Sequence, residues 1–411
     1  MTEDTDKAQV LSFEEARAVV EGQAGLLHPS ETETLALLDA IGRVLARAVA
    51  ADRDLPPFPR ATRDGYAVRS ADLAVLPARL QVIGEIRAGE VPDHLPSNLS
   101  HGQTIAIMTG APVPSGADAV VMVEFTAKKD KYVEITKGVA AGENIVPRGA
   151  EAHQGAILLD KGTRLNDAAI ALAASAGRSQ ILVYRRPRVA ILATGDEIVD
   201  IDASPSPTQI RNSNSYSLAV QVKGAGGEPE LAPVAPDEPR MLKQLIEQGL
   251  RSDLLLITGG VSMGRYDLVE QVLDELRAEF FFTGAKIQPG RPIVFGKARG
   301  KYVFGLPGNP ISTMVTFELF ARPILDALAG MSPRKLRFLH ARAKTEIRVK
   351  SGLTRFLPAI LTGEFENTYI ELVPWQGSGD IAAVARANCY AVIAPDRERI
   401  AVEEWVPVMM K

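Results

Sequence analysis

Residues 254–267 read LLLITGGVSMGRYD and place an apolar run, a glycine-rich loop and the start of a helix in direct succession. Leu254–Thr258 has the composition of a buried strand, and residues 268–273 resume with helical periodicity. Glycine lets the intervening backbone adopt positive φ and approach a ligand closely. A strand, a glycine loop and a helix start together present backbone N–H groups to an anion. In such an anion site Asp267 could cap the helix or hold a cation that accompanies the anion. The same succession is equally typical of an ordinary tight turn with Asp267 as a helix cap.

The composition is that of a globular protein with several domains. A chain of 411 residues is too long for one core, which predicts about two to four domains. The apolar fraction is an ordinary 46%, and the net charge of −4 comes without a basic cluster, which argues against nucleic-acid binding. An apolar run of about 18 residues and a signal peptide are both absent, so we expect no membrane association. The single cysteine, Cys389, fits a reducing compartment, and we expect a cytoplasmic protein.

The motifs support neither a zinc site nor a common nucleotide-binding loop. The five histidines are scattered, and none has the spacing of a zinc ligand set. No GxxxxGK[ST] motif occurs, and no GxGxxG motif follows a strand. An anion site would therefore have to be built from the other glycine segments.

The N-terminal part predicts a helical region that is interrupted by an insertion. Ser12 and Glu15 form a capping-box pattern, and Asn166 and Gly177 have the residue types of a helix N-cap and a C′ position. Prolines make residues 54–59 a linker. The predicted helices are residues 12–22, a stretch that follows residues 34–41 and ends near residue 51, and 166–176; the predicted strands are 80–84, 104–108, 119–123 and 132–135. We predict an elongated helical and linker domain from residues 1–52 and 147–178, with an inserted β-rich domain of residues 53–146.

The C-terminal part predicts an α/β domain followed by a β domain. Strands and helices alternate from residue 188 onward, which favours a parallel sheet with helices on both faces. The predicted strands are 189–194, 230–234, 254–258 and 280–282 with a hairpin around 294–303, and the predicted helices are 213–224, 238–249, one from 267, and 311–328. We predict an α/β domain of residues 179–330 and a small β-barrel or sandwich of residues 331–411.

Three glycine-containing segments follow predicted strands of the α/β domain. They are Thr194–Glu197, Thr258–Gly264 and Gly305–Pro310. Ligands of open parallel sheets bind at the carboxyl ends of the strands. Because all three segments occupy such a position, we expect them to converge on one edge and to form a binding site there.

Polar side chains near these segments suggest oxyanion chemistry. Carboxylates in turns or at helix starts, beside an anion loop, commonly hold Mg²⁺ against a phosphate. Cations contribute charge to such a site, and arginine makes bidentate oxyanion contacts. Each of these residues alone is more often a cap, a turn residue or a solvated surface charge than part of a site. The candidate carboxylates are Asp64, Glu197, Asp237 and Asp267, the candidate hydroxyl is Thr109, and the candidate cations are Lys286, Arg291 and Arg211.

The motifs together resemble the molybdopterin molybdenumtransferase (MoeA) family, which includes the gephyrin E domain. The match extends over nearly the whole chain, in order and with similar spacing. The segments that carry the resemblance are Arg63–Ala67, Thr109–Ala111, Ala193–Glu197, Ile210–Ser215, Thr258–Gly264 with Asp267, Gln288–Pro292 and Gly305–Pro310.

The resemblance implies a fold and a reaction. It implies an elongated, L-shaped subunit with an inserted β domain, a molybdopterin-binding α/β domain and a C-terminal β-barrel, in a homodimer whose active cleft is shared. The implied reaction takes adenylylated molybdopterin (molybdopterin-AMP) and molybdate, releases AMP with Mg²⁺, and leaves molybdenum on the dithiolene. A molybdopterin adenylyltransferase or a molybdoenzyme chaperone is an implied protein partner.

The resemblance also implies roles for individual residues. The acidic residues used in activity would be Asp64, Glu197, Asp237 and Asp267, of which Asp64, Glu197 and Asp267 would hold the metal. The implied substrate-binding residues are Thr109, Thr194, Gly195, Asn212, Ser213, Thr258, Gly259, Gly260, Ser262, Gly264, Lys286, Arg291, Pro307, Gly308 and Asn309.

The chain departs from the family pattern at three places. Gln288 and Arg291 stand where the family usually has lysines, Glu151 stands for an aspartate, and Ala382 and Ala383 lie where two serines are common. These departures keep two alternatives open beside the insertion reaction. One is a paralogue that binds the pterin or a partner with weak catalysis, and the other is a molybdopterin adenylyltransferase.

Overall fold

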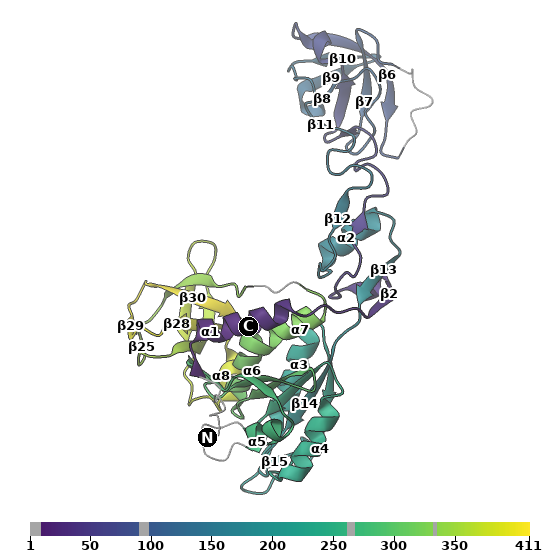
Figure 1. The fold of residues 1–411 in the computed structure, drawn as a ribbon. Coiled ribbons are helices and arrows are strands. Elements are labelled where there is room, and N and C mark those ends of the chain that lie inside the picture. The colour runs from purple at the N-terminus through teal and green to yellow at the C-terminus, as the bar shows by residue number, and fades with distance from the viewer. Residues whose placement is uncertain (1–9, 90–97, 261–267, 332–334) are drawn as a thin grey trace.

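The molecule is elongated, with a β-rich part at one end and an α/β part with a barrel at the other (Figure 1). This computed structural model describes residues 10–89, 98–260, 268–331 and 335–411. The chain leaves the α/β end after its first helix, forms the distant sheet, and returns before residue 188. Within the described ranges, no helix combines the length and the apolar character that crossing a bilayer requires.

The far end is a six-stranded sheet with strand order β8-β5-β7-β6-β10-β9. The four predicted strands are present, and β5 and β9 are additional to them. Gly65 is required at the start of β5, because a Cβ there would lie 1.8 Å from the carbonyl oxygen of Val121 on the neighbouring strand. The strands are β5 (Gly65–Val68), β6 (Ala78–Ile86), β7 (Gln103–Ile107), β8 (Ala119–Met122), β9 (Thr126–Lys129) and β10 (Tyr132–Ile135).

A narrow stalk joins the two ends, and its outgoing and returning segments pair as antiparallel strands. The predicted helical stretch that follows residue 41 and ends near residue 51 is wrong, because turns, isolated bridges and the strand β3 occupy it. The partner of β3 lies more than a hundred residues further along the chain, so local periodicity could not reveal the pairing. The stalk contains β2 (Thr32–Ala36) with β13 (Gln180–Tyr184), η1 (Leu37–Ala40), β3 (Val49–Ala50) with β12 (Ile157–Leu159), β4 (Arg60–Ala61) with β11 (Ile145–Val146), and α2 (Asp167–Ser175), which Asn166 caps as predicted.

Arginines fix the joint between the stalk and the α/β part. Arg164 donates from Nε to the carbonyl oxygen of Gly42 at 3.2 Å, and its guanidinium also bonds the carbonyl of Ala225 in the α/β part. Arg185 donates from Nη2 to Asp253 at 3.0 Å. These bonds connect backbone and side chains on both sides of the joint, so they define its angle.

Helix α1 (Phe13–Gly25) belongs structurally to the α/β end. Its capping box is formed as predicted: the Glu15 N–H donates to Ser12 Oγ at 3.2 Å, and the Ser12 N–H donates to the Glu15 carboxylate at 2.8 Å. The Phe13 ring packs edge-on against Phe320 and Phe356, at centroid distances of 6.3 and 5.3 Å. Since Phe320 lies in the α/β part and Phe356 in the barrel, α1 holds these two parts together.

The α/β part has a six-stranded sheet with order β17-β14-β18-β23-β22-β19, whose first four strands are parallel. Helices cover both faces, as predicted: Leu254 and Leu256 of β18 belong to the core on one face, and Leu255 and Ile257 to the core on the other. The strands are β14 (Arg188–Ala193), β17 (Glu228–Leu231), β18 (Leu254–Thr258), β19 (Glu279–Phe282), β22 (Val294–Ala298) and β23 (Lys301–Leu306). The helices are α3 (Ser213–Gly224), α4 (Pro239–Gly249), α5 (Leu268–Glu275), and α6 (Pro310–Thr316) continued by a π-helical turn η5 (Phe317–Ala321) and α7 (Arg322–Leu328).

The C-terminal part is a closed five-stranded barrel, in line with the predicted barrel or sandwich. Its strand order is β26-β27-β24-β30-β28, and β28 closes the ring by pairing with β26. Cys389 is fully buried in the barrel wall, and burial raises the pKa of its thiol to about 11, as expected of a packing residue. The elements are β24 (Leu339–Ala343), β26 (Thr354–Thr362), β27 (Tyr369–Leu372), α8 (Ile381–Arg386), β28 (Cys389–Ile393) and β30 (Trp405–Met410).

Removal of the α1 cap tests the role of this helix. Ser12→Ala should destabilise α1 by about 1 kcal/mol, because the N–H of Glu15 loses its side-chain acceptor. Amide hydrogen exchange of residues 13–17 reports this change directly. Ser12→Asp, which can still accept that bond, should retain the protection, and equal exchange in the alanine variant and the wild type would contradict the proposed capping.

Candidate functional site

The carboxyl ends of three parallel strands meet at one edge of the α/β sheet. Register places Ala193 of β14 beside Thr258 of β18, and Thr258 beside Leu306 of β23. Beyond the strand ends the loops also bond to one another, since the Gly259 N–H donates to the carbonyl of Leu306 at 3.2 Å. The predicted convergence of the three glycine segments is therefore confirmed for their described residues.

Glycine is required where these loops approach each other. Gly259 has φ +91°, and a Cβ there would lie 2.3 Å from the carbonyl oxygen of Thr194. Gly195 has φ +143°, and its Cβ would lie 2.5 Å from the Glu197 carboxylate, which folds back over it. A larger residue at position 259 would push the two loops apart, whereas one at position 195 would be strained by the positive φ and would displace the Glu197 side chain.

Asn214 at the start of α3 ties two of the loops together. Its Nδ2 donates to Thr258 Oγ1 at 2.9 Å and to the carbonyl oxygen of Gly308 at 2.7 Å. Asn212, one of the predicted substrate-binding residues, is buried and accepts from the Ser215 N–H at 3.1 Å as the N-cap of α3, next to Ser213. The start of α3 thus holds the ends of two glycine loops together through hydrogen bonds.

Carboxylates gather where β14 ends. Thr194 Oγ1 donates to Asp237 at 3.1 Å, and the Asp237 N–H donates to Asp196 Oδ1 at 3.0 Å. Glu197 follows directly and is exposed. No group of three or more metal-type side chains is formed within the described ranges. The predicted residues Ser262, Gly264 and Asp267 lie outside the described residues.

Asp64 and Thr109 form a pair at the other end of the molecule. The backbone N–H and the hydroxyl of Thr109 donate to Asp64 Oδ1 at 2.6 and 2.8 Å. These bonds, the backbone one first, hold the pKa of the Asp64 carboxyl below its usual range. Asp64 precedes β5 and Thr109 follows β7 in the distant sheet, so one chain does not bring the pair to Glu197 or Asp237 (Figure 1).

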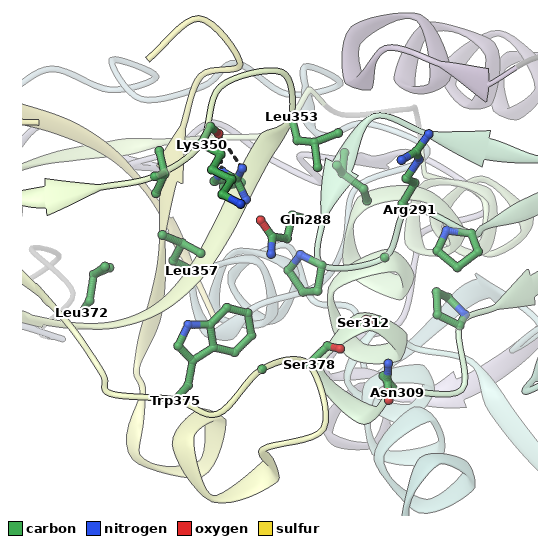
Figure 2. A pocket seen from close by; sticks show the side chains of 18 of the residues that line it. Gln288, Arg291, Asn309, Ser312, Lys350, Leu353, Leu357, Leu372, Trp375 and Ser378 are labelled. Atoms are coloured by element: carbon green, nitrogen blue, oxygen red, sulfur yellow. Dashed lines mark hydrogen bonds between the residues drawn. The ribbon is translucent and has the colours of Figure 1, made fainter. Parts of the chain in front are cut away.

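A cavity of about 980 Å³ lies between the loop edge and the barrel. Figure 2 shows it from close by, with Gln288, Arg291, Asn309 and Ser312 on the α/β side. Pro307 and Asn309 belong both to the β23 loop and to the cavity lining, so the cavity continues the strand-end site. The remaining lining residues are Ile287, Pro289, Gly290, Pro292, Arg348, Val349, Lys350, Leu353, Arg355, Leu357, Leu372, Trp375, Gly377 and Ser378.

Arg355 places a buried positive charge in the cavity wall. It is 8% exposed, and its described partner is the carbonyl oxygen of Lys350, to which Nε donates at 3.1 Å. No described carboxylate pairs with it. A buried cation without a counter-ion favours binding of an anion. Strand β21 (Ile287–Gln288) places Gln288 opposite Arg355, so the α/β part and the barrel both contribute to this spot.

The other predicted cations have different surroundings. Arg291 is exposed and lines the cavity. Lys286 does not belong to the described lining; its backbone N–H donates to Leu11 at 2.7 Å, and its charge helps to lower the pKa of Glu15 after the Ser12 hydrogen bonds. Arg211 donates to the carbonyl of Ala203 at 3.2 Å. Sequence reasoning missed Asn214, Arg355 and the rest of the barrel-side lining, since these positions matter only through contacts between distant segments.

Comparison with known proteins identifies the family. Three family models match in succession: the MoeA N-terminal region (domain I and II) over residues 11–177, the "probable molybdopterin binding domain" over 190–327, and the MoeA C-terminal region (domain IV) over 340–410. A protein of Nostoc sp. named molybdopterin molybdenumtransferase is 36% identical over 380 residues, which are 88% of this chain and 85% of that protein. The chain belongs to the molybdopterin molybdenumtransferase family.

Further members of the family agree with this assignment. A Bacillus subtilis protein of the same name is 33% identical over 88% of this chain and 86% of its own length. A crystal structure of the molybdopterin biosynthesis MoeA protein from Pyrococcus horikoshii OT3 is 28% identical, with a TM-score of 0.78 and coverage of 98% of this chain and 100% of that one. The resemblance inferred from the motifs and the predicted multidomain molybdenumtransferase fold are thereby confirmed.

A substitution in the glycine loop tests the close approach at the strand ends. Gly259→Ala should lower the free energy of unfolding by more than about 1 kcal/mol, because the new Cβ meets the Thr194 carbonyl and φ is positive. Denaturant unfolding measures the loss. Gly224→Ala in α3, where a Cβ meets nothing within 4 Å, is the matched control and should be neutral or slightly stabilising. Equal stability of the two variants would argue against a tight loop contact.

The Asp64–Thr109 pair makes a prediction about pH. Thr109→Val removes the hydroxyl donor and keeps the backbone donor, so the pKa of Asp64 should rise toward its usual value. Carbon-detected NMR titration of the aspartate carboxyls measures the shift. In the wild type the stabilisation from this pair is present above the ordinary aspartate pKa and is lost as the pH falls through the lowered pKa. An unchanged Asp64 titration in the valine variant would contradict the assignment.

Proposed function

We propose that this protein inserts molybdenum into adenylylated molybdopterin, consuming molybdate and releasing AMP. The observation that supports this most is the continuity of the glycine-loop edge with a cavity that contains an unpaired buried cation, in a member of the molybdopterin molybdenumtransferase family. The substrate combines a phosphoanhydride with a dithiolene, and the reaction needs a second oxyanion beside the dithiolene. The edge suits the phosphates and the cavity suits the oxyanion.

The phosphate groups would bind at the strand ends. Backbone N–H groups in positive-φ loops are good donors to phosphate oxygens, and Gly260 is such a position. The N–H groups of Gly195 and Gly259 donate to the carbonyls of Ala235 and Leu306, so these two glycines would contribute by letting a phosphate approach the backbone closely. The other proposed contacts come from the same edge. They are Thr194, Asn212, Ser213, Thr258, Pro307, Gly308 and Asn309, with Ser262 and Gly264 proposed from the sequence alone.

The carboxylates at this edge fit Mg²⁺. Mg²⁺ prefers oxygen ligands and keeps several waters and substrate phosphates in its shell, so it does not require a closed protein cage. The exposed Glu197 carboxylate next to the phosphate loops suits this role, with Asp237 beside it and Asp267 proposed from the sequence. Mg²⁺ would neutralise the charge that develops on the phosphoanhydride when AMP leaves.

Molybdate would bind in the cavity. Molybdate is a tetrahedral dianion, and Arg355 and Arg291 supply two positive charges on the lining. Gln288 contributes an amide that donates or accepts a hydrogen bond in place of the charge of a lysine. Lys286 is a weaker candidate for molybdate binding than the sequence suggested, because it is not among the described lining residues.

The position of Asp64 supports a homodimer. Asp64 and Thr109 lie at the end of the stalk opposite to Glu197 and Asp237 (Figure 1). If all of them act in one reaction, the distant sheet of one subunit must reach the α/β edge of another. We propose such a shared cleft, in a cytoplasmic enzyme that receives its substrate from a molybdopterin adenylyltransferase or delivers its product to a molybdoenzyme chaperone.

The proposed function is tested by incubating the purified protein with adenylylated molybdopterin, Mg²⁺ and molybdate and following AMP release. Molybdate-stimulated release is expected. Tight binding of the pterin without release would favour the binding paralogue instead. Adenylylation of molybdopterin from ATP by this chain alone would favour the adenylyltransferase.

Neutralising the buried cation should weaken oxyanion binding. Arg355→Gln should reduce the affinity for molybdate by about tenfold or more, because charge-assisted bonds to the anion are lost. Isothermal titration calorimetry with molybdate measures this effect, and Arg355→Lys should recover part of it. Arg348→Gln is the control, since Arg348 lines the same cavity but is exposed and paired with Glu346. A larger effect at Arg348 than at Arg355 would contradict the assignment.

The shared cleft predicts complementation between inactive variants. Asp64→Ala and Glu197→Gln should each abolish most AMP release when pure. After random mixing of the subunits, about a quarter of the wild-type activity should return, because half of the dimers are mixed and each has one of its two clefts intact. Mixing Asp64→Ala with Thr109→Ala is the control and should restore nothing, since both residues lie in the same sheet. Absence of recovery in the first mixture would argue for a site within one chain.

A further inference from the structure

The cavity has an apolar side that the oxyanion does not use. Leu357, Leu372 and Trp375 line it on the side away from Asn309 and Ser312 (Figure 2). Trp375 is the one aromatic residue in the described lining. A volume of about 980 Å³ is in the range of pockets that hold organic ligands and far exceeds the needs of a tetrahedral ion.

Trp375 is held in place from behind and open toward the cavity. It packs partly buried against Val373, Ala383 and Ala387 of the barrel, and Figure 2 shows its indole pointing into the cavity between Ser378 and Leu357. A ring that is fixed in this way loses little entropy when a planar ligand stacks on it. Aromatic rings pair favourably in offset-stacked geometry, beyond the burial of their area.

We infer that Trp375 is the stacking platform for the pterin ring of the substrate, an inference that rests on the proposed function. In adenylylated molybdopterin the dithiolene lies between the phosphates and the pterin. The cavity is continuous with the strand-end loops through Pro307 and Asn309, and its other walls carry the charge of Arg355 and the ring of Trp375. With the phosphates on the loops and the dithiolene beside the oxyanion, the pterin reaches the apolar side.

The adenine of the substrate is the competing aromatic group. Adenine is attached to the phosphates on the side opposite to the dithiolene. Bound in the same direction, adenine would lie past Gly259 and Gly195 and away from the barrel. Pterin and AMP as separate probes therefore distinguish the two groups.

Tryptophan fluorescence tests the inference, because the chain has two tryptophans. The second, Trp405, is half exposed on the outside of the barrel beside Arg342. Trp405→Phe leaves Trp375 as the single tryptophan, which is excited selectively at wavelengths that tyrosine does not absorb. Titration with 6-hydroxymethylpterin should quench its emission saturably, whereas AMP and molybdate should not. Quenching by AMP, or no quenching by the pterin up to its solubility limit, would overturn the inference.

Substitution of the ring separates a pterin contact from a structural role. Trp375→Leu should weaken binding of the pterin roughly fivefold or more by calorimetry and raise KM for adenylylated molybdopterin with little change in kcat, while Trp375→Phe should lose less. Molybdate affinity should be unchanged in both variants, which also verifies an intact cavity. Trp405→Leu is the matched control. Equal binding of the pterin by wild type and Trp375→Leu, or an equal loss of molybdate binding, would contradict the inference.

The experiments distinguish a failure of the Trp375 inference from a failure of the proposed function. Pterin-dependent quenching of Trp375 without molybdate-stimulated AMP release would support the platform and reject the catalysis. AMP release that is insensitive to Trp375→Leu, in both KM and kcat, would support the catalysis and reject the platform.

Discussion

The site depends on the parallel, in-register pairing of β14, β18 and β23. This pairing ends three strands at the same level, so that Thr194, Gly259 and Gly308 come together although the chain between them forms helices on both faces of the sheet. A slip of one residue would exchange the two faces of each strand and bury the wrong side chains. All five residues of β18 are buried, so such a slip would force the side chains of both neighbouring cores to repack. The loops need little further organisation, apart from the bridge that Asn214 makes between them.

The cavity depends on a second constraint, the contact between the α/β part and the barrel. Its polar side and its apolar side come from different parts of the chain, and the pairing of Gln288 with Arg355 joins them. The N-terminal helix α1 reinforces this contact, because Phe13 touches aromatic rings of both parts. A segment far from the strand ends in sequence thus maintains the shape of the cavity.

The sequence predicted well those elements that are specified by neighbouring residues. The alternation of strands and helices after residue 188, the glycine segments and the caps at Ser12 and Asn166 all follow from neighbouring residues, and the structure contains them. The stretch that follows residue 41 was predicted wrongly as a helix, because its strand β3 is specified by pairing with β12, far along the chain. Arg355 and Asn214 were missed for a related reason. Asn214 lies within the motif segment Ile210–Ser215, but its bonds to two loops, like the burial of Arg355, depend on contacts across the fold that neighbouring residues do not reveal.

The stalk has a mechanical consequence. Its segments pair only two strands at a time, and it carries Asp64 and Thr109 at its far end. Such an arrangement is a lever: a small rotation at the joint of Arg164 and Arg185 becomes a large displacement at the tip. The accuracy with which the tip meets another surface is therefore set at the pivot. The hydrogen bonds of Arg164 and Arg185 at the joint therefore contribute to that alignment, although they lie far from the tip.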